Sequence, residues 1–309
     1  VAAGATVGAA NLHMADAGHI TGAAAELTTV QISDTGSNGT VTITALDSTL
    51  DADLSTIVAG TITAEFDNSQ TFVGDLGSVS VIVADAATMT LSAARASAKT
   101  IGEADVTNAT VDITELESTL DANLSNITTN TITAALATGD TAKEIAAGAN
   151  LGTATVNIAG TGVVTVAAGA TVDAAHLVMA TTSTITGAAV DLSGVQTSGV
   201  GTVTVTALEG KLDADFSSIA ADTAFTAGLN SSGDVTILGA ADLGTATVNI
   251  SHAGLVTVAS GATVDAAHLV MGTTSIITGA AIDLSGVQTS GAGTVTVTAL
   301  EGKLDADFS

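Results

Sequence analysis

The chain contains no cysteine, proline, tryptophan or tyrosine, and only 5 of its 309 residues are lysine or arginine. Without cysteine it can form no disulfide framework, thiolate metal site or thiol nucleophile. With so few cations it has no basic surface for phosphate groups, so we expect no nucleic-acid partner. Thr, Ser, Gly or Asp interrupts every apolar run, so no stretch is long enough for a membrane-spanning helix and no membrane insertion is expected.

Acidic, small and β-branched residues take the place of what is missing. There are 31 Asp and Glu residues, which give a formal net charge of −26, and 33 glycines. A hydrophobic fraction of 46% is enough to bury a core, so the low content of charged residues does not indicate disorder. Such a charge repels itself, and salt or divalent cations would ease that repulsion.

Internal repeats are the dominant feature. Residues 152–217 align without a gap with residues 244–309, and only nine of the 66 positions differ. We divide the chain into copy 1 (1–82), the more diverged copy 2 (83–165), copy 3 (166–257) and the partial copy 4 (258–309), all within one continuous solenoid. Because the sequence begins and stops inside a copy, we expect a window on a longer array, or a subunit whose ends neighbours meet.

The differences between copies 3 and 4 indicate which positions are packed. Val163 is replaced by Leu255 and Val190 by Ile282, which keeps an apolar side chain of similar volume. Gly160-Thr161, by contrast, is replaced by His252-Ala253, as expected of a solvated turn. We therefore expect Val163 and Val190 to lie in the core.

A finer period lies inside each copy. Runs that alternate Val or Ile with Thr recur about every 20 residues, at 20–21, 41–44, 61–63, 164–166, 184–186, 203–206 and 223–227. Alternation predicts strands with one buried face, and the interval suits a crossover that returns parallel to the previous strand. We therefore predict a repeat solenoid with a parallel β-sheet (a β-solenoid), about 20 residues per coil, and short α-helices or loops as crossovers. The alternative is an α/β solenoid similar in outline to leucine-rich repeats, although the consensus of that family is absent.

One crossover predicts an amphipathic helix over residues 206–219. Leu208, Leu212, Phe216 and Ile219 share one helical face, and Thr206 with Glu209 fits a capping box. The same pairing of Thr with an acid recurs at 44 and 47, at 114 and 117, and at 298 and 301. The crossovers at 169–180 and 187–199 are shorter, and we interpret them as single helical turns or plain loops.

Acidic residues recur along these crossovers and are candidates for a Ca²⁺ site, since hard cations prefer carboxylate oxygens. The candidate metal ligands are Asp47, Asp51 and Asp53 in copy 1, Glu209, Asp213 and Asp215 in copy 3, and Glu301, Asp305 and Asp307 in copy 4. The diverged copy has Asn123 at the third position. The competing interpretation is the solvated face of the amphipathic helix, with acids favoured near its N-terminus.

Other chemistry is poorly supported. The five histidines form no His-x-x-x-His pair, and Gly-x-Ser-x-Gly and the phosphate-binding loop are absent. We therefore expect no enzyme, no catalytic residues and no cofactor other than the possible Ca²⁺. The Thr-x-Thr strands could form flat ranks of hydroxyl and methyl groups, as on ice-binding faces; the alternative is ordinary strand propensity with Thr on the wet face.

Residues 83–96, and the pattern Leu208-x-x-x-Leu212-Asp-Ala-Asp-Phe216-Ser-x-Ile219, resemble the long repetitive surface proteins of bacteria, which are adhesin-like or matrix-like. The resemblance implies an extracellular or cell-surface location. We predict a structural, non-enzymatic repeat protein that forms a rod or filament, self-assembles end to end, and has copies of itself as partners. The alternative is a Ca²⁺-dependent adhesin stalk whose ligand-binding part lies outside this sequence.

Overall fold

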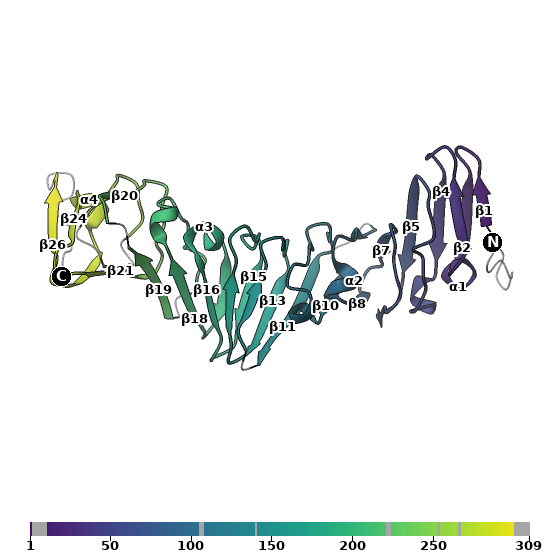
Figure 1. Cartoon of the computed structure of the whole chain (residues 1–309), viewed down its shortest axis with the longest axis horizontal. Helices are drawn as coiled ribbons and strands as arrows, with labels where there is room; N and C mark the ends of the chain where they lie inside the picture. Colours follow the sequence, from purple (N-terminus) through teal and green to yellow (C-terminus); the bar gives the residue numbers. More distant parts are fainter. Residues whose placement is uncertain are drawn as a thin grey trace. The chain divides into compact units, whose positions relative to one another are not determined.

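The computed structural model describes residues 1, 11–104, 108–139, 141–220, 224–230, 232–251, 254–264 and 267–299. The chain forms a parallel β-solenoid of about 13 turns, with about 21 residues per turn and few helices. The predicted fold class and its coil length are therefore confirmed. Strands from successive turns lie side by side in parallel, as Figure 1 shows within each part of the chain.

The chain divides into two compact units. Unit 1 comprises Val1–Leu136 and Asn150–Thr155, and unit 2 comprises Ala137–Ala149 and Val156–Ser309. Unit 1 holds β1 (Asn11–Met14), β2 (His19–Ala23), α1 (Ala24–Leu27), β3 (Gln31–Asp34), β4 (Thr40–Thr44), η1 (Leu46–Ser48), β5 (Thr61–Phe66), β6 (Gln70–Thr71), β7 (Ser80–Val83), β8 (Thr88–Ser92), α2 (Ala93–Ala96), β9 (Ile101–Glu103), β10 (Thr110–Thr114), η2 (Leu116–Ser118) and the start of β11 (Thr131–Gly139). Its parallel sheets run in the orders β1-β3, β2-β4-β5-β7-β9 and β6-β8-β10-β11.

Unit 2 repeats the same plan. It holds β12 (Lys143–Ile145), β13 (Thr155–Gly160), β14 (Val163–Val166), β15 (His176–Met179), β16 (Thr184–Ala188), α3 (Ala189–Leu192), β17 (Gln196–Gly199), β18 (Thr202–Thr206), η3 (Leu208–Gly210), β19 (Ala224–Leu229), β20 (Val235–Ile237), β21 (Thr247–Ile250), β22 (Leu255–Val258), β23 (His268–Met271), β24 (Ile276–Ala280), α4 (Ala281–Leu284), β25 (Gln288–Gly291) and β26 (Thr294–Thr298). Its sheets run β13-β15-β17, β12-β14-β16-β18-β19-β21-β23-β25 and β20-β22-β24-β26.

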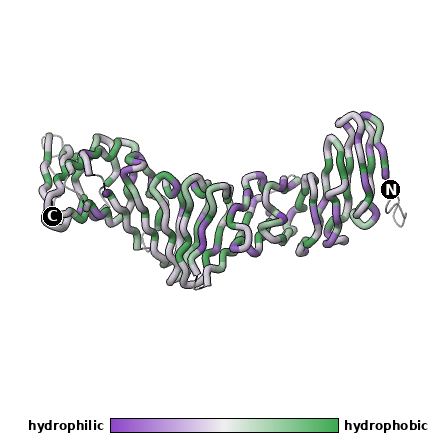
Figure 2. Tube along the Cα trace, viewed as in Figure 1, coloured by the Kyte–Doolittle hydropathy of each residue, from purple (hydrophilic) through white to green (hydrophobic). Residues whose placement is uncertain are grey.

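Alternation along each strand builds the core. In β16 and β18 the partners Ile185 and Val203 are fully buried, while their neighbours Thr184 and Thr202, also paired, are partly exposed. The period of two places every second side chain inside, and the parallel register stacks like on like from one coil to the next. The same alternation of apolar and polar residues is visible along the trace in Figure 2.

The one-turn helices α1, α3 and α4 each pack a leucine over a glycine in the strand before them. A Cβ added to Gly187 in β16 would lie only 3.0 Å from Cγ of Leu192, the last residue of α3, which is fully buried. Gly279 and Leu284 repeat this contact in copy 4. The glycine is therefore required for the close approach of the helical turn, which explains a residue type that otherwise weakens strands.

The predicted helix over residues 206–219 is wrong. Only the 3₁₀ turn η3 forms there, and its N-cap residue Ala207 is left-handed (φ 51°) with no side-chain cap. Thr206 instead ends β18, and its hydroxyl donates to the carbonyl of Gly187. The turns at Leu46 and Leu116 are likewise 3₁₀ and uncapped.

The helix-like spacing of the apolar residues between 208 and 219 arises from a different local structure. From 213 to 216 burial alternates, with Ala214 and Phe216 inside and Asp213 and Asp215 outside, so the segment is extended. Asp, Ser and Gly compete with helical hydrogen bonds through local turns, which disfavours a long helix here. Where a solenoid chain changes direction every few residues, its buried side chains can recur at intervals similar to those of an α-helix.

Two further expectations need correction. The crossovers at 169–180 and 187–199 are more than turns or loops, since they contain β15 and, after α3, β17. Val190 and Ile282 do not lie in the core: both are 57% exposed, and Val163 is 37% exposed. Retention of apolar character between copies therefore does not indicate burial. Across the part of the chain with described positions, we find no helix with the length and apolar character needed to cross a bilayer.

Candidate functional site

The recurrent acids occupy a ladder of turns rather than a helical face. Asp53 pairs with Asp75 on the next coil, and Asp215 pairs with Asp242, through isolated parallel bridges. Each is followed by a buried Leu or Phe and then by Ser or Gly, and its Oδ1 accepts the backbone N–H two residues on. The members of this Asx ladder, with the residue whose N–H they accept, are Asp53 (Ser55), Asp75 (Gly77), Asn123 (Ser125), Asn150 (Gly152), Asp215 (Ser217) and Asp242 (Gly244).

The ladder explains why an asparagine stands among the acids. Oδ1 of Asp215 accepts from the backbone N–H of Ser217 at 3.0 Å and from its hydroxyl at 2.6 Å. Oδ1 of Asn123 accepts the same two bonds from Ser125, at 3.1 and 2.7 Å. What the turn requires is an acceptor oxygen two residues before an N–H, which either side chain supplies.

These bonds act on the acid–base equilibrium. The hydroxyl and backbone N–H of Ser55 lower the pKa of Asp53, and those of Ser217 lower the pKa of Asp215, because both donors favour the charged form. The two carboxylates are therefore held ionised by their own turns.

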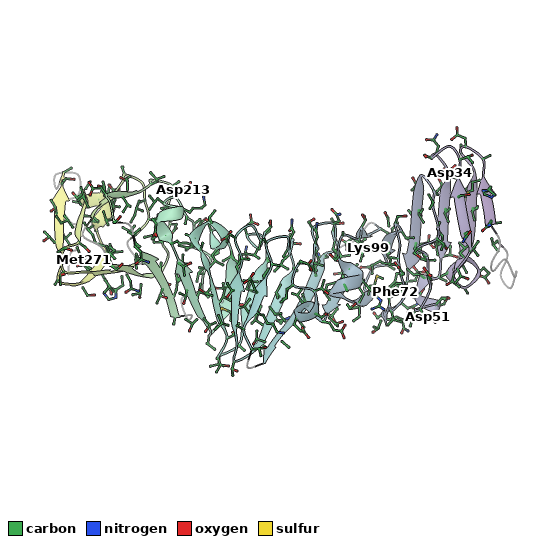
Figure 3. The ribbon with its side chains drawn as sticks, viewed as in Figure 1. Asp34, Asp51, Phe72, Lys99, Asp213 and Met271 are labelled. Carbon is green, nitrogen blue, oxygen red and sulfur yellow. The ribbon has the colours of Figure 1, made fainter. Side chains whose placement is uncertain are left out.

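The other candidate acids of copies 1 and 3 differ in their surroundings. Asp47 accepts a hydrogen bond from the amide of Asn68, and Oε2 of Glu209 accepts the backbone N–H of Asn230 at 3.1 Å. Asp213 pairs with Lys211 at 3.0 Å, and this neighbour lowers the pKa of Asp213 by hydrogen bond and charge. Asp51 is exposed on the crossover after η1; Asp51 and Asp213 are labelled in Figure 3.

The Ca²⁺ prediction remains a prediction. Within the described ranges, no three or more histidine and acidic side chains are grouped so as to hold a metal ion. The third candidate set, Glu301, Asp305 and Asp307, lies outside the described residues. Ladder residues of the same charge do lie opposite each other on successive coils, Asp53 with Asp75 and Asp215 with Asp242, joined by backbone bridges.

Two of the five cations line one groove of unit 1. Arg95 and Lys99 border a groove of about 650 Å³ together with Asp53 and Asp75. Nε of Arg95 donates to the carbonyls of Val73 and Gly74 at 2.8 and 3.0 Å, and Nζ of Lys99 donates to that of Gly77 at 2.5 Å. The cations therefore satisfy backbone carbonyls and lie beside the stacked carboxylates. Lys99 is labelled in Figure 3, as is Phe72, which directly precedes Val73.

The equivalent histidines of copies 3 and 4 bridge neighbouring coils. Nε2 of His176 lies 2.9 Å from Oγ of Ser198, and Nε2 of His268 lies 2.9 Å from Oγ of Ser290. Both pairs join partners in adjacent strands, which is a structural use of the ring. Sequence reasoning could not find this pairing, because the partners are separated by a full coil of the chain.

No protein-family model matches this chain, and no curated protein or solved structure matches it.

Proposed function

We propose that this chain is a structural, non-enzymatic protein of the cell surface or extracellular space. In this proposal it forms a rod or filament by end-to-end stacking, and its partners are copies of itself. The resemblance to long bacterial surface proteins supports the location. An acidic, cysteine-free and largely β composition suits a scaffold exposed to salt.

The observation that carries the proposal is that one coil interface is reused on different neighbours. The strand β14 pairs with β16 and β16 with β18, and further along the chain β22, β24 and β26 repeat both pairings in the same register. The first set stacks on Lys143–Ile145, whereas the second stacks on Val235–Ile237. Backbone pairing, rather than a specific set of side chains, joins one coil to the next. A coil from another molecule would meet the same interface.

Electron microscopy over rising protein concentration, at low and high salt, tests this proposal. Filaments should lengthen with concentration, and salt should promote them because it screens the charge of −26. Isolated particles at high concentration in both salts would count against self-assembly.

A matched pair of variants sharpens the test. Val203 is fully buried and pairs with Phe225 of the next coil, whereas the equivalent Val295 in β26 is 39% exposed. Val295→Asp should block stacking at this face, because a carboxylate would be buried unpaired. Val58→Asp, at a residue that is 61% exposed, is the control and should leave assembly unchanged.

A Ca²⁺-dependent adhesin stalk is the second candidate, and the stacked ladder carboxylates favour it. Asp53 with Asp75, and Asp215 with Asp242, place like charges on neighbouring coils, where a divalent cation would relieve repulsion. Calorimetry with Ca²⁺ after chelation should give a stoichiometry that follows the number of such pairs. No heat, together with an unchanged melting temperature, would remove this candidate.

A further inference from the structure

A regular lattice of threonine side chains covers one outer face of unit 2. Its central rank runs across five successive strands as Thr165, Thr186, Thr204, Thr226 and Thr247, each paired with the next. A second rank beside it contains Thr184 and Thr202, and Thr206 extends the lattice on the other side. We refer to these eight residues, on β14, β16, β18, β19 and β21, as the threonine lattice.

The hydroxyl groups of this lattice are almost all unused within the protein. Of the eight lattice residues, only Thr206 donates its hydroxyl to a described protein group, the carbonyl of Gly187. The other seven side chains are partly exposed and make no hydrogen bond through the hydroxyl to a described protein group. Threonine propensity for strands explains each residue singly, but a rank of unpaired hydroxyls also leaves a surface with regular donor and acceptor capacity.

The lattice also excludes charge, on a chain whose formal net charge is −26. Between Glu144 at one end of the central rank and His268 at the other, the five positions are all threonine. The outward positions next to Thr184 and Thr202 along their rank are Val163 and Ala224. Neutral methyl and hydroxyl groups therefore form a continuous patch, although the chain is rich in acids.

The spacing of the lattice points to its ligand. Neighbouring strands lie about 4.8 Å apart, and alternate residues along a strand about 6.7 Å apart. This mesh is close to the repeat distances between water oxygens on the faces of hexagonal ice. Methyl groups at this spacing can hold water in cages between the ranks, and hydroxyls can anchor those cages by hydrogen bonds.

We propose that the threonine lattice binds ice, through water ordered on its hydroxyl and methyl groups. A crystalline polysaccharide is the competing ligand for a regular neutral surface. It is disfavoured because the chain contains no Tyr or Trp to stack on sugar rings. The proposal is independent of self-assembly, which concerns the coil ends.

The other unit offers an internal comparison. In unit 1 the rank Thr71, Thr90, Asp112 and Thr133 has a carboxylate in the middle, and the hydroxyl of Thr133 donates to it at 2.7 Å. Charge and a spent hydroxyl interrupt the mesh there. Another rank of unit 1, made of Thr21, Thr42 and Thr63, carries no charge, but it continues as Ser80, and the hydroxyl of Thr21 lies 3.1 Å from Nε2 of His19. The lattice of unit 2 is the longer run of paired threonines, and we expect it to be the stronger ice-binding surface.

The test compares ice growth in the presence of the full chain and two variants. Thr204→Lys places a long cation at the centre of the lattice, while Gln196→Lys adds the same charge on the exposed strand β17 of another sheet. The native chain should shape ice crystals and depress their growth temperature. Thr204→Lys should lose most of that effect, and Gln196→Lys should keep it.

Circular dichroism and the melting temperature of each variant show whether it remains folded. If Thr204→Lys unfolds, Thr204→Gln, which is smaller and uncharged, replaces it and should lose the same effect. The proposal is overturned if the native chain leaves ice growth unchanged, if a folded lattice variant retains full activity, or if Gln196→Lys loses activity equally. Sedimentation with crystalline cellulose or chitin that only the lattice variant abolishes, without an effect on ice, would replace ice by a polysaccharide surface.

Discussion

The helical turns α2 in unit 1 and α3 in unit 2 each directly follow a five-residue strand, but their third residues carry opposite charge. In α3, Oδ1 of Asp191 accepts the backbone N–H of Gly169 at 3.1 Å, and Asp283 does the same with Gly261 in copy 4. In α2 the third residue is Arg95, which donates to the carbonyls of Val73 and Gly74, in the turn that follows Phe72.

This difference indicates that the backbone group exposed by the preceding coil determines whether the third residue of the helical turn is acidic or basic. A turn that presents an N–H is matched by an acid, and a turn that presents carbonyls is matched by a cation. In both cases the side chain supplies the hydrogen-bond partner that the backbone group of the turn requires. At Arg95, the sequence difference of copy 2 is therefore matched by the backbone of the neighbouring coil.

The largest effect on the free energy of unfolding is expected at Phe72, which precedes the turn that Arg95 binds. Phe72 is fully buried, and Phe72→Ala should lower the free energy of unfolding by about 3–5 kcal/mol through loss of apolar contact and a residual cavity. Val166 precedes the turn of unit 2 that contains Gly169 and is also buried, so Val166→Ala is the comparison and should have the smaller effect. Chemical denaturation of both variants measures this, and a larger loss for Val166→Ala would contradict the anchoring role of Phe72.

The next largest effect on the free energy of unfolding is expected from reversing the charge at Arg95. Arg95→Asp places a carboxylate against the carbonyls of Val73 and Gly74, and should lower the free energy of unfolding by about 1–2 kcal/mol. Arg95→Lys keeps a donor and should be milder. Hydrogen exchange should show faster opening of the coil containing Phe72 in Arg95→Asp. Equal exchange in native chain and variant would refute the matching rule.

The Asx ladder predicts a difference between two substitutions at one site. Asp215→Ala removes both hydrogen bonds from Ser217, and should lower the free energy of unfolding by about 1 kcal/mol. Asp215→Asn should be nearly neutral at pH 7, since Asn123 makes the same bonds in unit 1. Thermal melting distinguishes them. If asparagine is as harmful as alanine, the charge matters and the Ca²⁺ candidate gains support.

The smallest expected effect is a dependence on acid. The pKa values of Asp53 and Asp215 are lower in the folded chain than in the unfolded one, so the unfolded chain binds protons first as pH falls. Their stabilisation is fully present above the unfolded pKa of about 4 and is lost as pH falls through the folded pKa. Melting from pH 7 to pH 2 should therefore show a shallower loss for Asp53→Asn/Asp215→Asn than for the native chain. Parallel curves would contradict the assignment.

Much of the fold could be predicted from the sequence because period and β-branched composition are local signals. The runs at 41–44 and 203–206 are strands, and the regular interval between successive runs does mark a parallel return. The second strand of a coil, such as His176–Met179, could not be predicted because so short a segment between turns has too little alternation to identify it.

The acidic positions could be found from the sequence, but their arrangement could not. Asp53 and Asp215 recur visibly, yet their use as turn acceptors depends on the N–H two residues on and on a left-handed or extended backbone that composition does not specify. Asn123 was the available signal, since an amide in an otherwise acidic series favours a hydrogen-bond role over a metal ligand. Pairing between coils, as for His176 and Ser198, required the register.

The register of neighbouring coils is the central claim, and the absence of cysteine makes it directly measurable. Thr186 and Thr204 are paired partners in β16 and β18, with Cα atoms expected about 4.8 Å apart, within the range that a disulfide bridges. Thr186→Cys/Thr204→Cys should therefore cross-link rapidly on mild oxidation. Thr184→Cys/Thr204→Cys, which is offset by two residues along the strands, should cross-link far more slowly. Equal rates, or faster cross-linking of the offset pair, would contradict the parallel in-register solenoid.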